Sequence, residues 1–271
     1  MTKHLARFAL VSLLLFSSAG NAPAADVEVD VELVLAVDVS RSMSPRELEI
    51  QRRGYASALT SPEVTKAISS GLIGKIALTY YEWAGHTSQR TIIPWTLVET
   101  AADAEAIALK LTAQFNPSLR RTSISGAIDH GASLFSDNGY RGMRRVIDVS
   151  GDGPNNNGRA VVKARDAAVA QGTIINGLPL MTREGMGSRF HITDLDEYYR
   201  ACVVGGPGSF VIPVRRWEEF PQAVRQKLVL ELASNPVLPK RTAFRSRKAN
   251  GTIDCMIGER IWNRYFRDWA Q

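Results

Sequence analysis

An alternation of apolar runs with helical patterns constrains the fold of this chain more than any other feature. Strands are predicted over residues 29–40, 75–85, 89–98, 144–153, 173–181 and 209–214, and helices over 44–69, 100–115, 123–137, 159–172, 195–204 and 218–233. Strands separated by helices of this length form a mostly parallel sheet with both faces covered. We therefore expect a doubly wound α/β fold, a mostly parallel sheet flanked by helices, over about residues 28–234.

Composition agrees with a folded domain of this kind. The chain has 271 residues, which is enough for one large α/β domain or two small ones. Its 45% hydrophobic and 22% charged residues are ordinary for a globular protein with a core. The formal net charge is +6, and five of the basic residues lie in the segment 239–248. This weak and local basicity does not indicate a nucleic-acid partner, and we expect none.

The first 25 residues have the pattern of a secretory signal peptide. Lys3 and Arg7 give a positively charged stretch before a short apolar run at residues 8–16, and residues 22–24 fit the small-residue cleavage pattern. The apolar run is too short to span a bilayer, and no other segment is long and apolar enough to be a transmembrane helix. We expect cleavage after residue 24 or 25, and a periplasmic or secreted mature protein without a transmembrane segment.

The chain contains two cysteines, Cys202 and Cys255. Neither lies in a CxxC motif or near a histidine, and in an oxidising compartment two thiols more often pair than stay free. We expect a disulfide that ties the tail, residues 235–271, to the domain. The tail itself is predicted to be a basic linker followed by a short amphipathic helix over 258–269.

The strand 29–40 ends in an oxygen-rich loop, Asp38-x-Ser40-x-Ser42. Directly after it, Ser44 can cap the next helix, with Pro45 at the first helical position and Glu47 completing a capping box. Since Ser44 can do the capping, Ser40 and Ser42 are free for another role.

Two further oxygen-bearing loops are predicted at the same edge of the sheet. Thr122 precedes the helix that begins near Ser123. Asp152 lies just past residues 145–150, in the glycine-flanked turn that ends the predicted strand segment 144–153. Ligands of such sheets bind in the crevice at the carboxyl ends of the strands. Hydroxyls and carboxylates are hard ligands that suit Mg²⁺, Mn²⁺ or Ca²⁺ rather than zinc or copper.

Together, these three loops resemble the metal-ion-dependent adhesion site of the von Willebrand factor type A domain. The signal peptide, the loop SGDGPNN at 150–156 and the segment CVVGGPGSF at 202–210 resemble a bacterial branch of uncharacterised secreted proteins with this domain. The resemblance implies that Ser40 and Ser42 bind a divalent cation directly, and that Thr122 binds it directly or through water. It implies that Asp38 and Asp152 bind the ion or hold its coordinated waters. It also implies a protein partner whose exposed acidic residue fills the open position of the ion, without catalytic turnover.

The sequence departs from the family pattern at two of the loops. Arg120 and Arg121 precede Thr122, where the family usually has a glycine-rich turn. Ser150 and Gly151 separate Asp152 from the strand, and Asp148 is a nearby rival, although inside the strand it is expected to be buried and hydrogen-bonded.

Two other classes of function stay open, a periplasmic hydrolase that uses the Ser/Asp cluster and a metal-free structural envelope protein. Neither Ser40 nor Ser150 lies in a G-x-S-x-G motif, and the mature chain has only His86, His130 and His191 as possible bases. We expect no enzyme activity.

Four aromatic residues, Tyr80, Tyr81, Trp83 and Trp95, fall in predicted strands. Core or half-buried positions are typical of such residues. Trp83 lies close to a strand end, so it is the one expected to line the binding face.

Overall fold

The computed structural model describes residues 25–113, 119–182, 191–233 and 253–269. Its sheet contains β1 (Val27–Asp38), β2 (Ile76–Trp83), β3 (Gln89–Val98), β4 (Tyr140–Gly151) and β5 (Thr173–Pro179). The strand order is β3-β2-β1-β4-β5, in which β2 and β3 form an antiparallel hairpin and the other neighbours are parallel. The predicted α/β fold with a mostly parallel sheet is therefore confirmed.

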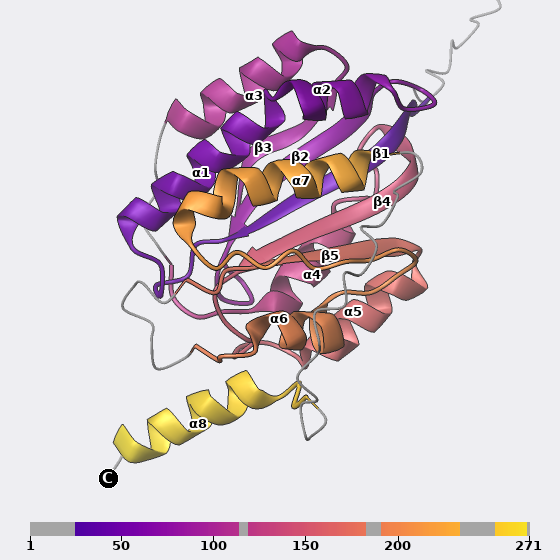
Figure 1. Cartoon of the computed structure of the whole chain (residues 1–271). Helices are drawn as coiled ribbons and strands as arrows, with labels where there is room; N and C mark the ends of the chain where they lie inside the picture. The colour runs from indigo at the N-terminus through magenta and orange to yellow at the C-terminus, as the bar shows by residue number, and fades with distance from the viewer. Residues whose placement is uncertain (1–24, 114–118, 183–190, 234–252, 270–271) are drawn as a thin grey trace, which may run out of the picture.

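Helices cover both faces of this sheet (Figure 1). One layer holds α1 (Pro45–Leu59), α2 (Pro62–Ser69), α3 (Ala101–Ala113) and α7 (Phe220–Leu232). The other holds α4 (Ile124–Ser133), α5 (Val161–Ala170) and α6 (Leu195–Tyr198), which continues as a π-helical turn, Tyr199–Val203. A 3₁₀ turn, Trp217–Glu219, leads into α7. The last helix, α8 (Ile257–Trp269), lies outside both layers, beyond α6 (Figure 1).

The central strand β1 is buried on both faces. Its side chains alternate, so that Leu33 and Leu35 pack in the core beneath α1 and α7 while Val34 and Ala36 pack beneath α4 and α5. This two-sided burial explains why the sequence of β1 is a nearly continuous apolar run, as is typical of parallel strands.

Local signals set the start of the first two helices. Ser44 caps α1, and its capping box with Glu47 is present as predicted. The helical pattern at 44–69 divides into two helices, because Ser61 caps a second helix whose first residue is Pro62. Proline has no backbone N–H and cannot continue the preceding helix.

The last predicted strand, residues 209–214, is wrong as a regular strand. This segment lies beside β5 and forms only isolated bridges, from Val211 to Gly177 and from Val214 to Leu180. Pro213 lies between these two bridges, and because it lacks an N–H donor it cannot extend a ladder.

The prediction for Trp83 is also wrong. Its side chain is fully buried in the core on the α4 and α5 side of the sheet, so it cannot line a surface for a partner. Position on β2 explains this, because that strand is buried along its whole length between β1 and β3.

A disulfide joins Cys202 to Cys255, whose Cα atoms are 5.5 Å apart. It connects the π-helical turn after α6 to the residues just before α8. Residues 1–24 of the predicted signal peptide and the basic segment 239–248 lie outside the described residues. Within the described ranges, no helix combines the length and apolar character that a bilayer crossing requires.

Candidate metal centre

The strand order creates a switch point at the carboxyl ends of β1 and β4. From β1 the chain first builds β2 on one side and later builds β4 on the other, and Val37 pairs with Ser150 near both strand ends. Such a switch point opens a crevice in which α/β proteins bind ligands. Asp38 is the last residue of β1, and Asp152 directly follows β4, so the first and third predicted loops lie side by side.

A chain of hydrogen bonds joins four of the five predicted site residues. The backbone N–H of Ser40 donates to Asp38 Oδ1 at 2.6 Å, and the hydroxyls of Ser40 and Ser42 are 2.9 Å apart. Ser42 Oγ donates to Asp152 Oδ1 at 2.8 Å. Asp38, Ser40 and Asp152 are buried, and Ser42 is partly exposed. These four residues therefore form one compact, mostly buried cluster.

Thr122 reaches this end of the sheet through its backbone. Residues of its loop pair with the first loop, since Leu119 N donates to Val39 O at 2.8 Å. Thr122 N donates to Asn156 Oδ1 at 3.0 Å, and Asn156 N donates to Thr122 O at 2.9 Å. Within the described chain, no hydrogen bond joins the side chain of Thr122 to the other four residues. The second loop thus borders the cluster, while the hydroxyl of Thr122 is not hydrogen-bonded to it in the described chain.

The chemistry of these donors decides whether a cation fits. In the part of the chain that the structure describes, no three His, Cys, Asp or Glu residues form a group that could hold a metal ion. An ion at the cluster would therefore depend on serine hydroxyls as well as carboxylates. Neighbouring donors of an octahedral Mg²⁺ lie about 2.9 Å apart. The Ser40–Ser42 and Ser42–Asp152 distances, 2.9 and 2.8 Å, match this spacing, and they equally suit O–H···O hydrogen bonds.

Asp38 supplies the clearest sign that the cluster is incomplete. Its Oδ2 is buried and has no hydrogen-bond partner in the described chain. Burial raises the pKa of Asp38 well above its usual range, and the negative charge of Asp152 raises it further. A Cβ atom at Gly151 would lie 2.9 Å from this oxygen and 2.9 Å from the Tyr199 hydroxyl, so only glycine fits beside the carboxylate. A divalent cation would offset both negative charges, and the residues present fit one.

The sequence offered His191 as one of three possible bases but did not place it beside the three loops. Its Nε2 lies 3.5 Å from Asp152 Oδ2, within ion-pair range but long for a hydrogen bond, and Asp152 raises the pKa of the imidazole. Only the residue type could have drawn attention to it, because no spacing links it to the three loops. Asp152 lies between Ser42 and His191, whereas a hydrolytic triad needs the histidine between the serine and the acid.

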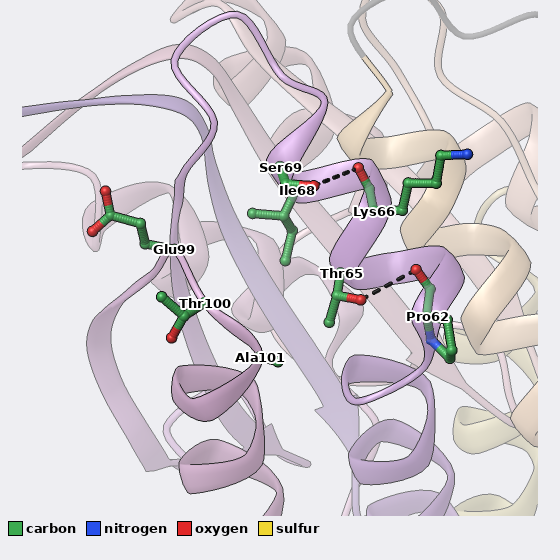
Figure 2. Close-up of a pocket in the computed structure, with 8 residues that line it drawn as sticks. All are labelled: Pro62, Thr65, Lys66, Ile68, Ser69, Glu99, Thr100 and Ala101. Atoms are coloured by element: carbon green, nitrogen blue, oxygen red, sulfur yellow. Dashed lines mark hydrogen bonds between the residues drawn. The ribbon is translucent and has the colours of Figure 1, made fainter.

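A separate pocket of about 300 Å³ lies between α2 and the start of α3 (Figure 2). It sits at the opposite end of the sheet, because Val98, just before Glu99 of its lining, pairs with Ile76, the first residue of β2. The hydroxyls of Thr65 and Ser69 on its wall donate to backbone carbonyls of their own helix. No set of groups in it converges on a ligand.

Comparison with a protein family covers most of the chain. The family described as protein of unknown function (DUF1194) matches residues 28–236. No curated protein matches the chain. The matched region includes all three loops and ends before α8.

Comparison with solved structures shows the fold. Proximal thread matrix protein 1 of the mussel byssus, solved with a zinc-occupied MIDAS motif, has a TM-score of 0.53 and 14% identity over 77% of this chain and 49% of its own. A von Willebrand factor type A protein from Catenulispora acidiphila has a TM-score of 0.52 and 11% identity over 76% and 43%. The pilus adhesin SpaC from Lactobacillus rhamnosus GG has a TM-score of 0.52 and 11% identity over 77% and 32%. The chain thus spans half or less of these proteins and shares the type A fold with them.

Proposed function

Because the chain belongs to the DUF1194 family and has the fold of a von Willebrand factor type A domain, we propose that it binds a divalent cation and uses it to recognise an acidic group on a protein partner. The observation that carries this proposal is the buried cluster in which Ser40, Ser42 and Asp152 are joined beside the unpartnered Oδ2 of Asp38.

Each residue of the cluster has a separate task in this proposal. The hydroxyls of Ser40 and Ser42 bind the ion, and the carboxylates of Asp38 and Asp152 balance its charge directly or through water. Thr122, which borders the cluster, adds a hydroxyl directly or through water. When bound, the ion supplies an open coordination position that a carboxylate of the partner can fill. The protein itself catalyses no reaction.

The oxygen donors favour Mg²⁺, with Mn²⁺ and Ca²⁺ as the other hard cations that suit them. Imidazole nitrogen is a ligand that zinc accepts readily, so His191 beside Asp152 is a reason to include Zn²⁺ in any titration. Occupation of such a motif by zinc in the byssus protein supports a divalent ion in general.

We further propose that the protein acts in the periplasm or outside the cell. The signal-peptide pattern and the disulfide support this, because disulfides persist in oxidising compartments. N-terminal sequencing of protein recovered from a periplasmic extract tests it. A mature chain that begins at residue 25 or 26 is expected, and a chain found in the cytosol with its first 24 residues intact would contradict it.

The metal site is tested by calorimetric titration of the mature protein with Mg²⁺, Mn²⁺, Ca²⁺ and Zn²⁺. The double variant Ser40→Ala/Ser42→Ala removes both hydroxyl ligands and should abolish binding. Ser44→Ala is the matched control, because Ser44 lies in the same loop but caps α1 and should leave metal affinity unchanged. Equal titrations for the wild type and the double variant would show that the cluster binds no metal.

Recognition of an acidic group is tested with poly-L-glutamate and poly-L-glutamine as probes. The metal-loaded wild type should retain poly-L-glutamate. EDTA should release the probe, and the double variant should not retain it. Retention that persists in EDTA and in the double variant would be non-specific attraction of a polyanion to a basic protein. Hydrolysis of ester or phosphoester substrates that Ser40→Ala abolishes would instead establish an enzyme.

A further inference from the structure

The C-terminal helix α8 contacts two of the three loops that border the candidate metal centre. It lies outside the region that the DUF1194 family matches, which ends at residue 236. The disulfide between Cys202 and Cys255 holds the start of α8 covalently against the domain. Helix α8 is strongly amphipathic, and Trp262, Tyr265 and Phe266 pack against one another on one side of it.

The first contact is made with the second loop. The guanidinium carbon of Arg121 lies 3.9 Å from the ring centroid of Trp262 and 5.8 Å from that of Phe266, in cation–π range. Arg121 also has a φ of 76°, a left-handed conformation that is unfavourable for a residue with a Cβ atom. Since Arg121 directly precedes Thr122, the stacking on Trp262 holds the backbone that orients this predicted ligand.

The second contact is made with the third loop. Asn155 Nδ2 donates to Glu259 Oε1 at 2.7 Å, and Asn155 Oδ1 accepts from Ser125 N at 2.9 Å. Asn155 is fully buried, so these partners satisfy groups that water cannot reach. A Cβ atom on Gly258 would lie 2.1 Å from the backbone oxygen of Asn155, which means that the two backbones touch here. Asn155 follows Asp152 in the same loop, so α8 braces that loop as well.

From these contacts we infer that α8 is a covalently anchored brace of the metal centre, in which Glu259 and Trp262 position the third and second loops. This inference rests on the proposed metal binding. Residues that orient the ligands of a metal affect its affinity even though they do not touch it. The metal affinity of this chain should therefore depend on α8, which lies beyond the region that the family matches.

The test compares variants of the full mature chain by metal titration and by amide hydrogen exchange. Glu259→Ala/Trp262→Ala removes both braces, and metal affinity should fall about 10- to 100-fold, the usual effect of losing partners of metal ligands. Exchange of the Thr122, Ser125 and Asn156 amides, which donate hydrogen bonds around the two loops, should become faster. Exchange in the central strands should not change.

Two controls separate positioning from a general effect on folding, and a third variant tests the covalent anchor. Glu259→Gln/Trp262→Phe keeps an acceptor oxygen and an aromatic ring, so it should recover most of the affinity. Asn263 is exposed on α8, so Asn263→Ala should behave like the wild type. Cys202→Ala/Cys255→Ala removes the covalent anchor and should weaken metal binding in the same direction as loss of the braces.

The outcomes distinguish this inference from the proposed function. If the wild type and Glu259→Ala/Trp262→Ala bind metal equally well, α8 is not a brace, while the metal centre stands. Unchanged exchange of the two loops in that variant would overturn the brace as well. If the wild type binds none of the four ions, both the proposed function and the role of α8 in metal binding are overturned.

Discussion

A buried cluster of charges between β4 and α7 predicts how the stability of this protein depends on pH. Lys227 Nζ lies 2.7 Å from Asp148 Oδ1 and also pairs with Glu231, and all three side chains are buried. Asn176 Nδ2 donates to Glu231 Oε1 at 2.9 Å. Tyr55 of α1 faces the same cluster. Two carboxylates thus share one ammonium group.

This arrangement shifts the titration of Asp148. Burial raises the pKa of Asp148 to about 7, although the charge of Lys227 opposes the shift. In the unfolded chain the pKa of an aspartate is about 3.9. Because the folded value is the higher one, the stabilisation from this group is complete below about pH 4 and is lost as the pH rises through about 7.

The size of the effect follows from the two pKa values. At about 1.4 kcal/mol per pKa unit, the contribution of Asp148 to the free energy of unfolding should fall by about 2 to 3 kcal/mol between pH 5 and pH 8. Asp148→Asn keeps the shape and one acceptor oxygen for Lys227 but cannot titrate. Relative to the wild type, this variant should therefore gain about 2 to 3 kcal/mol over the same interval.

Urea unfolding followed by circular dichroism, with the disulfide intact, measures both proteins across this interval. Asp103→Asn is the control, because hydrogen bonds at Thr100 lower the pKa of Asp103, so that it titrates below the interval. Contributions that are common to the wild type and the variants cancel from the difference. Parallel pH profiles for the wild type and Asp148→Asn would refute the reasoning, since the buried carboxyl would then not titrate between pH 5 and pH 8.

Two further predictions concern helix α1. Ser44→Ala removes the cap of α1 and should lower the free energy of unfolding by about 1 kcal/mol in urea unfolding, and a loss below about 0.3 kcal/mol would show that the cap contributes little. Gly54→Ala should destabilise the protein by about 1 to 3 kcal/mol, because its Cβ would lie 2.5 Å from Phe220 Cδ1 in the packed contact with α7. A thermal midpoint equal to that of the wild type would show that Phe220 moves aside freely.

Features set by neighbouring residues could be predicted from the sequence. Alternating apolar runs and helical patterns led to the α/β fold, and Ser44 with Glu47 marked the start of α1. Hydrogen-bonding groups and side-chain periodicity act over a few residues, so these signals survive without knowledge of the rest of the chain. The exceptions were also local, as at Pro213, where one missing N–H interrupts the expected last strand.

The candidate site depends partly on the order of residues in the sequence and partly on how the loops pack. Its residue types and their order along the chain pointed to Asp38, Ser40, Ser42, Thr122 and Asp152, because strands of a parallel sheet end at one edge. Which of these side chains touch was decided by the packing of the loops, which joined Ser42 to Asp152 and linked Thr122 through its backbone. Whether they bind an ion stays a prediction.

Contacts between distant segments were decided only by the tertiary structure. His191 beside Asp152, Lys227 beside Asp148 and Trp262 over Arg121 join residues whose spacing in the chain carries no pattern. Each contact depends on how helices, strands and loops that are distant in the sequence pack against one another. The sequence by itself therefore determined the architecture and the edge of the sheet where a ligand can bind. Long-range packing decided which charges are buried together and which helix contacts the loops at that edge.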